Sequence, residues 1–262
     1  MKPLTITIPL ALAATLLGAP AAQAVPLSDE IQVYMDEINR PGERSVELHV
    51  NTTPKGRREP DFPGAVASHH GLRITPEISQ GLSEDTDAAL YLPALRDAAG
   101  NWYLAGAKLR LKWLPVRGDE AHGGWFVGAN GEIGNIGKRF SESRVSTELR
   151  LVAGYRSEAW QFGINPIFGW DLSPGQRENN PQFDLAWKIA RATAPGIGLG
   201  LEYYQGYGKP GNFLPKALAD RTLYLALDFD RKPWVFNLGI GRGLTEATDA
   251  WTIKAIFHLD FE

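Results

Sequence analysis

The chain has 262 residues, a formal net charge of −3, no cysteine, 28 glycines and 8 tryptophans. The mild charge and the absence of any run of lysine or arginine argue against a nucleic-acid-binding surface. A chain without cysteine cannot be stabilised by disulfides, so an exported product needs a large core or a closed ring of strand hydrogen bonds.

Residues 1–24 have the features of a cleaved export signal. A lysine stands at the second position, an apolar stretch runs over residues 4–17, and Ala22-Gln23-Ala24 fits a signal-peptidase site. The apolar stretch is short and rich in alanine, and an uncleaved signal anchor is the alternative interpretation. No later segment approaches the roughly twenty apolar residues of a transmembrane helix. The sequence therefore predicts an exported chain that begins at Val25.

Residues 25–43 differ in pattern from the rest of the chain. Ile31, Tyr34, Met35 and Ile38 have helix-like spacing, and the following Pro-Gly pair would end a helix. We interpret this segment as a short helical or irregular lead-in on the periplasmic side. The alternative, that it folds into the lumen of the following domain as a small plug, stays open.

Residues 44–262 alternate between apolar and polar side chains in one segment after another. A period of two predicts β-strands, because successive side chains leave a strand on opposite faces. The pattern gives about twelve strands. They are expected at 44–51, 71–80, 86–92, 102–114, 125–133, 144–155, 160–170, 182–192, 197–205, 223–230, 234–244 and 251–261.

The connections between these strands alternate in length. Those at 81–85, 157–158, 194–196 and 231–233 are short, with 116–124 as the exception, and those at 52–69, 95–101, 134–143, 172–181, 206–220 and 244–250 are longer. Short periplasmic turns and longer outer loops are typical of bacterial outer-membrane barrels. We therefore predict an all-β fold, an antiparallel up-and-down transmembrane β-barrel. A soluble lipocalin-like or sandwich protein is the alternative.

The tryptophans are sorted along the predicted strands. Trp113, Trp125, Trp160 and Trp234 fall beside the short connections, Trp102, Trp170 and Trp251 fall beside the longer ones, and Trp187 is mid-strand. Amphipathic rings prefer the two membrane interfaces, so the first seven are expected to form two aromatic belts.

The polar positions of the strands would line the lumen. They are Glu47, His49, Arg73, Glu77, Lys108, Arg110, Lys112, Glu148, Arg150, Lys188, Glu202, Asp228, Lys254 and His258. One interpretation is a set of paired charges that fills and stiffens a narrow lumen. The other is a selective channel, in which the basic stripe Lys108, Arg110 and Lys112 favours anions or small carboxylate-bearing solutes. A barrel of this size lies between filled barrels and wide porins.

Four segments carry a resemblance to known proteins. They are EIQVYMDEINRPG, HGLRITPEISQGL, YLAGAKLRLKWLP and DFDRKPWVFNLGIGRGLTEATDAWTIKAIF. They resemble a group of poorly characterised outer-membrane proteins of Gram-negative bacteria that are described as transporters, akin to the outer-membrane proteins associated with meta-pathway phenol degradation. The resemblance covers residues 30–261 and implies a porin-like barrel. It brings no substrate and no functional residue. Phe261 is penultimate, which departs from the usual C-terminal barrel-assembly signal.

Together these features predict a monomeric barrel in the outer membrane of a Gram-negative bacterium. It would let small polar or anionic solutes, aromatic acids among them, diffuse passively. The expected partners are outer-membrane lipid, the barrel-assembly machinery during biogenesis and small solutes, without nucleic acid. The alternative is a plugged structural or adhesive barrel that acts through its extracellular loops.

Catalysis and metal binding are not expected. A lipid hydrolase is the less favoured alternative, since no G-x-S-x-G motif occurs and the serines lie mostly in turns. His69 and His70 are adjacent, which places them poorly for chelating one ion together with His49. We therefore predict no catalytic residue, no cofactor and no metal.

Overall fold

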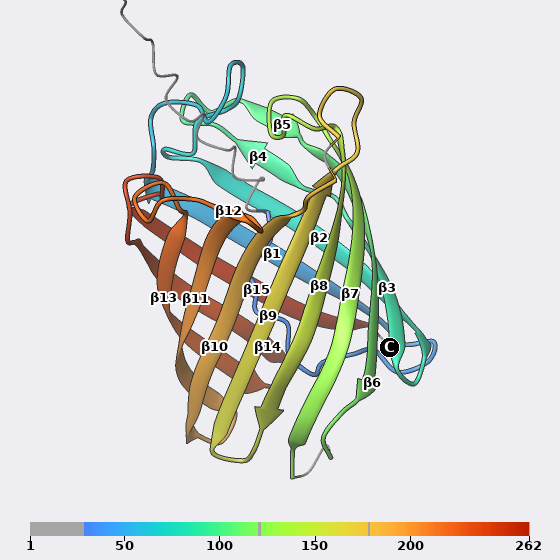
Figure 1. Ribbon diagram of the computed structural model, residues 1–262. Helices are drawn as coiled ribbons and strands as arrows, with labels where there is room; N and C mark the ends of the chain where they lie inside the picture. The colour runs from blue at the N-terminus through green and yellow to red at the C-terminus, as the bar shows by residue number, and fades with distance from the viewer. Residues whose placement is uncertain (1–28, 120–121, 178, 262) are drawn as a thin grey trace, which may run out of the picture.

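The computed structural model describes residues 29–119, 122–177 and 179–261, and the strands in these ranges form one antiparallel sheet. Twelve of its strands close into a barrel in the order β1-β15-β14-β13-β11-β10-β9-β8-β7-β6-β3-β2, and β2 pairs with β1 to complete the ring (Figure 1). Three short strands, β4, β5 and β12, extend the wall at the end that carries the longer loops. The predicted antiparallel barrel of about twelve strands is confirmed.

The bounds of the strands follow the predicted segments closely. They are β1 Arg44–Lys55, β2 Leu72–Ser83, β3 Thr86–Tyr91, β4 Ala94–Arg96, β5 Trp102–Leu104, β6 Gly106–Val116, β7 Gly124–Ile136, β8 Val145–Arg156, β9 Trp160–Asp171, β10 Gln182–Ala194, β11 Ile197–Lys209, β12 Asn212–Phe213, β13 Arg221–Arg231, β14 Trp234–Gly243 and β15 Trp251–Phe261. Within the described ranges no helix is long and apolar enough to cross a membrane.

The wall is apolar on the outside and polar on the inside. Large apolar side chains of the outer face are exposed, for example Leu104 at 74%, Trp125 at 70% and Leu225 at 63%. The positions between such residues are buried and often polar, as at Thr75 and Asn130. A soluble protein buries its apolar face, so this arrangement excludes the lipocalin-like or sandwich alternative. It is the distribution expected of a wall surrounded by lipid.

The predicted strand 102–114 is divided in two at Ala105. Gly106 has φ +147°, and a Cβ at this position would lie 2.0 Å from the carbonyl oxygen of Asn135 on β7. Only glycine fits there, and the irregularity reverses which side chains face outward. Unbroken alternation along 102–114 predicts that Ala105 faces outward with Leu109 and that Leu104 shares the face of the basic stripe. In the structure Ala105 is 1% exposed and Leu104 is 74% exposed. The predicted facing of these two residues was therefore wrong.

Residues 29–39 lie inside the barrel, and the exposed residues 40–43 connect them to β1. Residues 29–43 form an extended, irregular segment without helical turns, and Figure 1 shows the blue trace of residues 29–39 within the ring of strands. Of the two conformations predicted for the lead-in, the irregular one is found in its described part. The predicted export signal 1–24 and the residues up to 28 lie outside the described residues.

Candidate functional site in the barrel lumen

The interior segment, residues 29–39, is fixed to the wall by its own backbone. Asn165 of β9 accepts a hydrogen bond from the Tyr34 amide at 2.7 Å and donates one to the Tyr34 carbonyl at 3.0 Å. One wall side chain thereby satisfies both backbone groups of a buried residue, as a neighbouring strand would. Nearby, Val33, Tyr34 and Met35 pack against inward-facing apolar residues of the wall, namely Leu114, Phe126, Val152, Ile167 and Ala186.

The side chain of Tyr34 lies at the centre of this packing. Its hydroxyl is 2.9 Å from the hydroxyl of Tyr91 and 3.4 Å from Glu132. Its ring is 4.4 Å from the guanidinium of Arg150 and 5.1 Å from the ammonium of Lys112. Cations at this distance from an aromatic face are attracted by the ring. Tyr34 therefore joins the interior segment to four strands of the wall, β3, β6, β7 and β8.

Cations of the wall bind the interior segment along its length. Residues 29–39 contain Asp29, Glu30, Asp36 and Glu37 and no Lys, Arg or His, so this stretch carries a formal charge of −4. The contacts are Lys108 to Asp29 at 3.0 Å, Lys254 to the Ile31 carbonyl at 3.0 Å, Arg150 to the Gln32 carbonyl at 3.1 Å, Lys112 to the Glu37 carbonyl at 2.5 Å, and Arg156 to both Asp36 and Glu37. The basic face of the lumen is thus occupied by an acidic part of the same chain.

The fourteen predicted lumen residues all make contacts on the inner side of the wall. Nine of them line the larger cavity: Glu47, Glu77, Arg110, Lys112, Lys188, Glu202, Asp228, Lys254 and His258. Arg73 lines the smaller cavity, Lys108 and Arg150 contact the interior segment, His49 contacts Glu77, and Glu148 binds Arg150 at 3.0 Å. Oppositely charged members pair across strands, as in Lys188 with Asp228 at 2.7 Å.

Several further lumen residues were not predicted. Asp87 binds Arg110 at 3.2 Å, Glu132 binds Lys108 at 3.3 Å, and Asn165 holds Tyr34. All three stand at inward positions of alternating strands, so strand periodicity was the signal that could have identified them. The part played by Tyr34 had no such signal, because it depends on which wall residues surround the interior segment.

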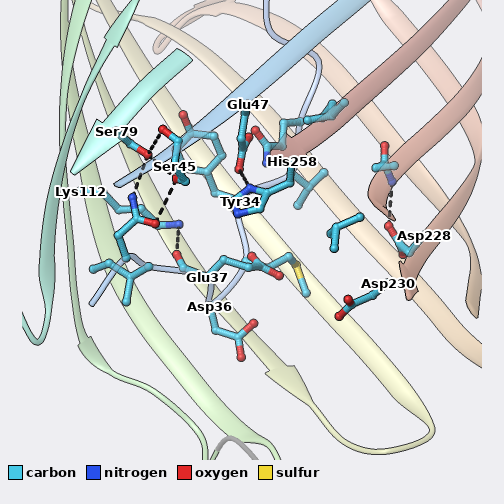
Figure 2. Close-up of a pocket in the computed structure, with 18 of the residues that line it drawn as sticks. Tyr34, Asp36, Glu37, Ser45, Glu47, Ser79, Lys112, Asp228, Asp230 and His258 are labelled. Carbon is cyan, nitrogen blue, oxygen red and sulfur yellow. Dashed lines mark hydrogen bonds and ion pairs between the residues drawn. The ribbon is translucent and has the colours of Figure 1, made fainter. Parts of the chain in front are cut away.

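Two cavities flank the interior segment. The larger has a volume of about 850 Å³ and reaches the end of the barrel that carries the short turns, near Lys232. Figure 2 shows Asp36, Glu37 and Asp230 at its margin, with Lys112 bonded to Glu37. Seven Lys or Arg and ten Asp or Glu side chains line it, so its wall is not predominantly positive. The smaller cavity, about 70 Å³, lies beyond Ile31 on the side of the long loops.

Asp220, in the connection ahead of β13, lines this smaller cavity. Burial raises the pKa of Asp220 to about 6, and the carboxylates of Asp249 and Asp61 act in the same direction, while Thr248 and Arg57 oppose the shift. The pKa of an unfolded aspartate is about 3.9. The folded chain therefore binds this proton more tightly than the unfolded chain, and stability falls as the pH rises from about 4 to about 6.

Replacing Asp220 by Asn should remove this loss of stability. We expect the Asp220→Asn variant to unfold several degrees above the wild type at neutral pH and at a similar temperature at pH 4, in thermal scans of the protein in detergent. Asp97→Asn is the control, because hydrogen bonds from Asn101 lower the pKa of Asp97 and its removal should act in the opposite direction. If the Asp220 variant and the wild type lose stability in parallel between pH 4 and 6, this assignment is wrong.

The predicted belt tryptophans differ in exposure. Trp102, Trp113, Trp125, Trp160, Trp234 and Trp251 are between 39% and 70% exposed, whereas Trp170 is only partly exposed. Trp187, predicted mid-strand, lies against Tyr203 with the ring centroids 5.5 Å apart. The seven predicted belt tryptophans lie near strand ends, where rings at a membrane interface would be expected.

The same fold occurs in solved outer-membrane channels. An outer membrane channel from Pseudomonas putida F1 matches with a TM-score of 0.59 and 13% identity, over 88% of this chain and 100% of that one. The KdgM porin matches with a TM-score of 0.54 and 8% identity over 83% and 99% of the two chains, and the NanC porin with 0.53 and 9% over 84% and 99%. KdgM has also been solved in complex with oligogalacturonate. No family model matches the chain, and no curated protein matches it.

Proposed function

We propose that this protein is a porin-like channel of the outer membrane of a Gram-negative bacterium. It would let small polar or anionic solutes, aromatic acids among them, diffuse passively. The observation that carries the proposal is a closed barrel with an apolar exterior and a charged interior, in which a cavity of about 850 Å³ reaches one end. The likeness to outer-membrane channels supports it, as does the acidic oligosaccharide bound by KdgM.

The interior segment modifies this proposal. The stripe of Lys108, Arg110 and Lys112 would attract anions if it faced water. In the structure these cations have partners within the protein. Lys108 contacts Asp29 and Glu132, and Arg110 contacts Glu77 and Asp87. Lys112 donates to the Glu37 carbonyl. We infer that the intact channel conducts weakly and that its anion preference becomes strong only when the interior segment moves.

The test is the conductance and ion selectivity of the purified protein in planar bilayers. In a salt gradient, the variant with Lys108, Arg110 and Lys112 all replaced by Ala should show a reversal potential shifted toward cation preference. Lys138→Ala is the control, since Lys138 is exposed outside the strands and should leave the potential unchanged. If no salt gives a current and the triple replacement changes nothing, the protein is not a channel.

A plugged barrel that acts through its extracellular loops is the second candidate. It is favoured by the number of bonds that hold the interior segment to the wall around Tyr34. This candidate predicts that the intact chain conducts under no salt or solute condition, because the interior segment stays in place. We do not propose a lipid hydrolase, because the sequence has no G-x-S-x-G motif and its serines lie mostly in turns.

The oligomeric state, the insertion route, the export signal and the link to phenol degradation also belong to the proposal. We propose that the barrel is monomeric, that it is inserted by the barrel-assembly machinery, and that residues 1–24 are its cleaved signal. A link to the outer-membrane proteins of phenol degradation is proposed from the sequence resemblance alone. Uptake of aromatic acids into liposomes that contain the protein would test that link.

A further inference from the structure

Three side chains on the inner faces of β1 and β2 converge on one point. Glu47 and Glu77 are direct partners across the two strands, and His49 lies two residues along β1 on the same face. The carboxylate and imidazole atoms of the three lie within 4.8 Å of one another. Like charges directly opposite each other destabilise a strand pair, so two facing glutamates need a cation between or beside them.

In each glutamate, one carboxylate oxygen contacts a neighbouring Arg or His side chain and the other faces His49. Oε1 of Glu77 binds Arg110 at 2.8 Å, and its Oε2 is 3.3 Å from Nε2 of His49. Oε1 of Glu47 is 3.1 Å from Nδ1 of His258, and its Oε2 is 3.6 Å from the same Nε2 of His49. Figure 2 shows Glu47 and His258 turned toward each other. Both Oε2 atoms therefore face the same ring nitrogen.

Hydrogen bonding alone accounts poorly for this arrangement. A single imidazole nitrogen carries at most one proton, so it cannot donate fully to two carboxylates. Both distances, 3.3 and 3.6 Å, exceed those of ordinary hydrogen bonds to charged groups. They match the edges of a tetrahedron around Zn²⁺, where ligand atoms about 2.0–2.2 Å from the metal lie roughly 3.3–3.6 Å apart.

We propose that Glu47, His49 and Glu77 bind a divalent transition-metal ion of the Zn²⁺ type. One nitrogen and two carboxylate oxygens form a ligand set suited to such an ion, and water from the larger cavity, which Glu47 and Glu77 line, would supply the fourth ligand. His258 and Arg110 orient the two carboxylates from behind, as outer hydrogen-bond partners do in metal sites. The expectation of no metal, drawn from the sequence, considered His49 only together with the loop pair His69 and His70.

The cavity provides the route by which an ion reaches the site. Glu47, Glu77 and His258 line the cavity of about 850 Å³ that opens at the short-turn end, while His49 is fully buried behind them. An ion entering from that end meets the two carboxylates first. A bound ion would link β1 to β2, next to the pairing of β1 with β15 that closes the barrel. The stability of this closure would therefore depend on the availability of the metal.

The test is a Zn²⁺ titration of the full chain in detergent, purified without a polyhistidine tag and first treated with a chelator. Isothermal titration should show binding of a single Zn²⁺ per chain, and X-ray absorption should show a shell of nitrogen and oxygen ligands with an imidazole. Zn²⁺ should also raise the unfolding temperature. Glu47→Gln and His49→Gln should each weaken binding at least a hundredfold, and His258→Gln should weaken it by about 10–100-fold, as loss of an outer partner does.

The remaining histidines supply the control. The chain has five in all, so a variant with His69, His70 and His122 replaced by Ala leaves only the two of the lumen and should bind Zn²⁺ like the wild type. Binding that disappears in this variant and survives Glu47→Gln would overturn the proposal, as would the absence of any binding. Equal affinity for Ca²⁺ would overturn the assignment to a transition metal. If His49→Gln fails to fold, the half-buried Glu47 variant still decides.

Discussion

A chain that begins at Arg40 should conduct several-fold more current per channel than the intact chain, and it should prefer anions more strongly. The deletion removes Tyr34 from the middle of the lumen and joins the two cavities that the interior segment separates. It also removes the four carboxylates of residues 29–39, which leaves Lys108, Lys112 and the other cations of the wall facing water. A wider path and a more positive wall act together on anion flux.

Single-channel recordings of both chains in planar bilayers provide the measurement. The barrel itself should persist, because its closure depends on pairing between β1, β2 and β15, to which residues before 40 contribute no strand. Circular dichroism and resistance to unfolding in cold detergent verify this. Adding a synthetic peptide of residues 29–39 should reduce the current again, and a scrambled peptide of equal charge should not. Equal conductance of a folded truncated chain and the intact chain would disprove the gating role of the segment.

Lys254→Met should lower the free energy of unfolding by about 3 kcal/mol, the lower end of the range for one broken buried ion pair. Lys254 is 1% exposed, binds Glu202 and donates to the Ile31 carbonyl at 3.0 Å. Its loss leaves the carboxylate of Glu202 buried with weaker partners. The cost stays at the lower end because Tyr204 and Asn237 still donate to Glu202, at 2.6 and 3.3 Å.

Urea unfolding from lipid vesicles measures this difference. The double variant Lys254→Met/Glu202→Gln should recover part of the lost stability, because a neutral amide is less costly to bury than an unpaired carboxylate. Lys138→Met, at an exposed loop position, should change the unfolding free energy by less than about 0.5 kcal/mol. A Lys254 variant as stable as the wild type would show that this pair contributes nothing net to the fold.

The barrel could be predicted because the alternation of side chains within each strand reflects the environments of its two faces. Where one face meets lipid and the other the lumen, the alternation is visible in segments such as β13 and β15 without knowledge of their neighbours. The division between β5 and β6 could not be predicted in this way. It depends on the close approach of Gly106 to the Asn135 carbonyl, a contact between residues far apart in sequence that leaves the local alternation almost unbroken.

The site was predictable in part. The inward positions of the charges followed from strand parity, whereas their partners depend on register and on the interior segment. The spacing of Ile31, Tyr34 and Met35 suggested a helix, yet this segment is extended, because Asn165 bonds the Tyr34 backbone and Met35 fits beside Gly163. Those wall residues are more than a hundred positions away, so no local pattern could reveal that the segment enters the lumen.

The interior segment is joined covalently to β1 through residues 40–43, and this has a consequence for any solute that binds the same cations. A tethered ligand competes at an effective concentration set by its linker, on the order of millimolar for a short one, whatever the abundance of the protein. A free anion must reach a comparable concentration, or bind more tightly, to displace it. The lumen would then respond to solute concentration as a threshold, passing little at trace levels and more once the tethered carboxylates are outcompeted.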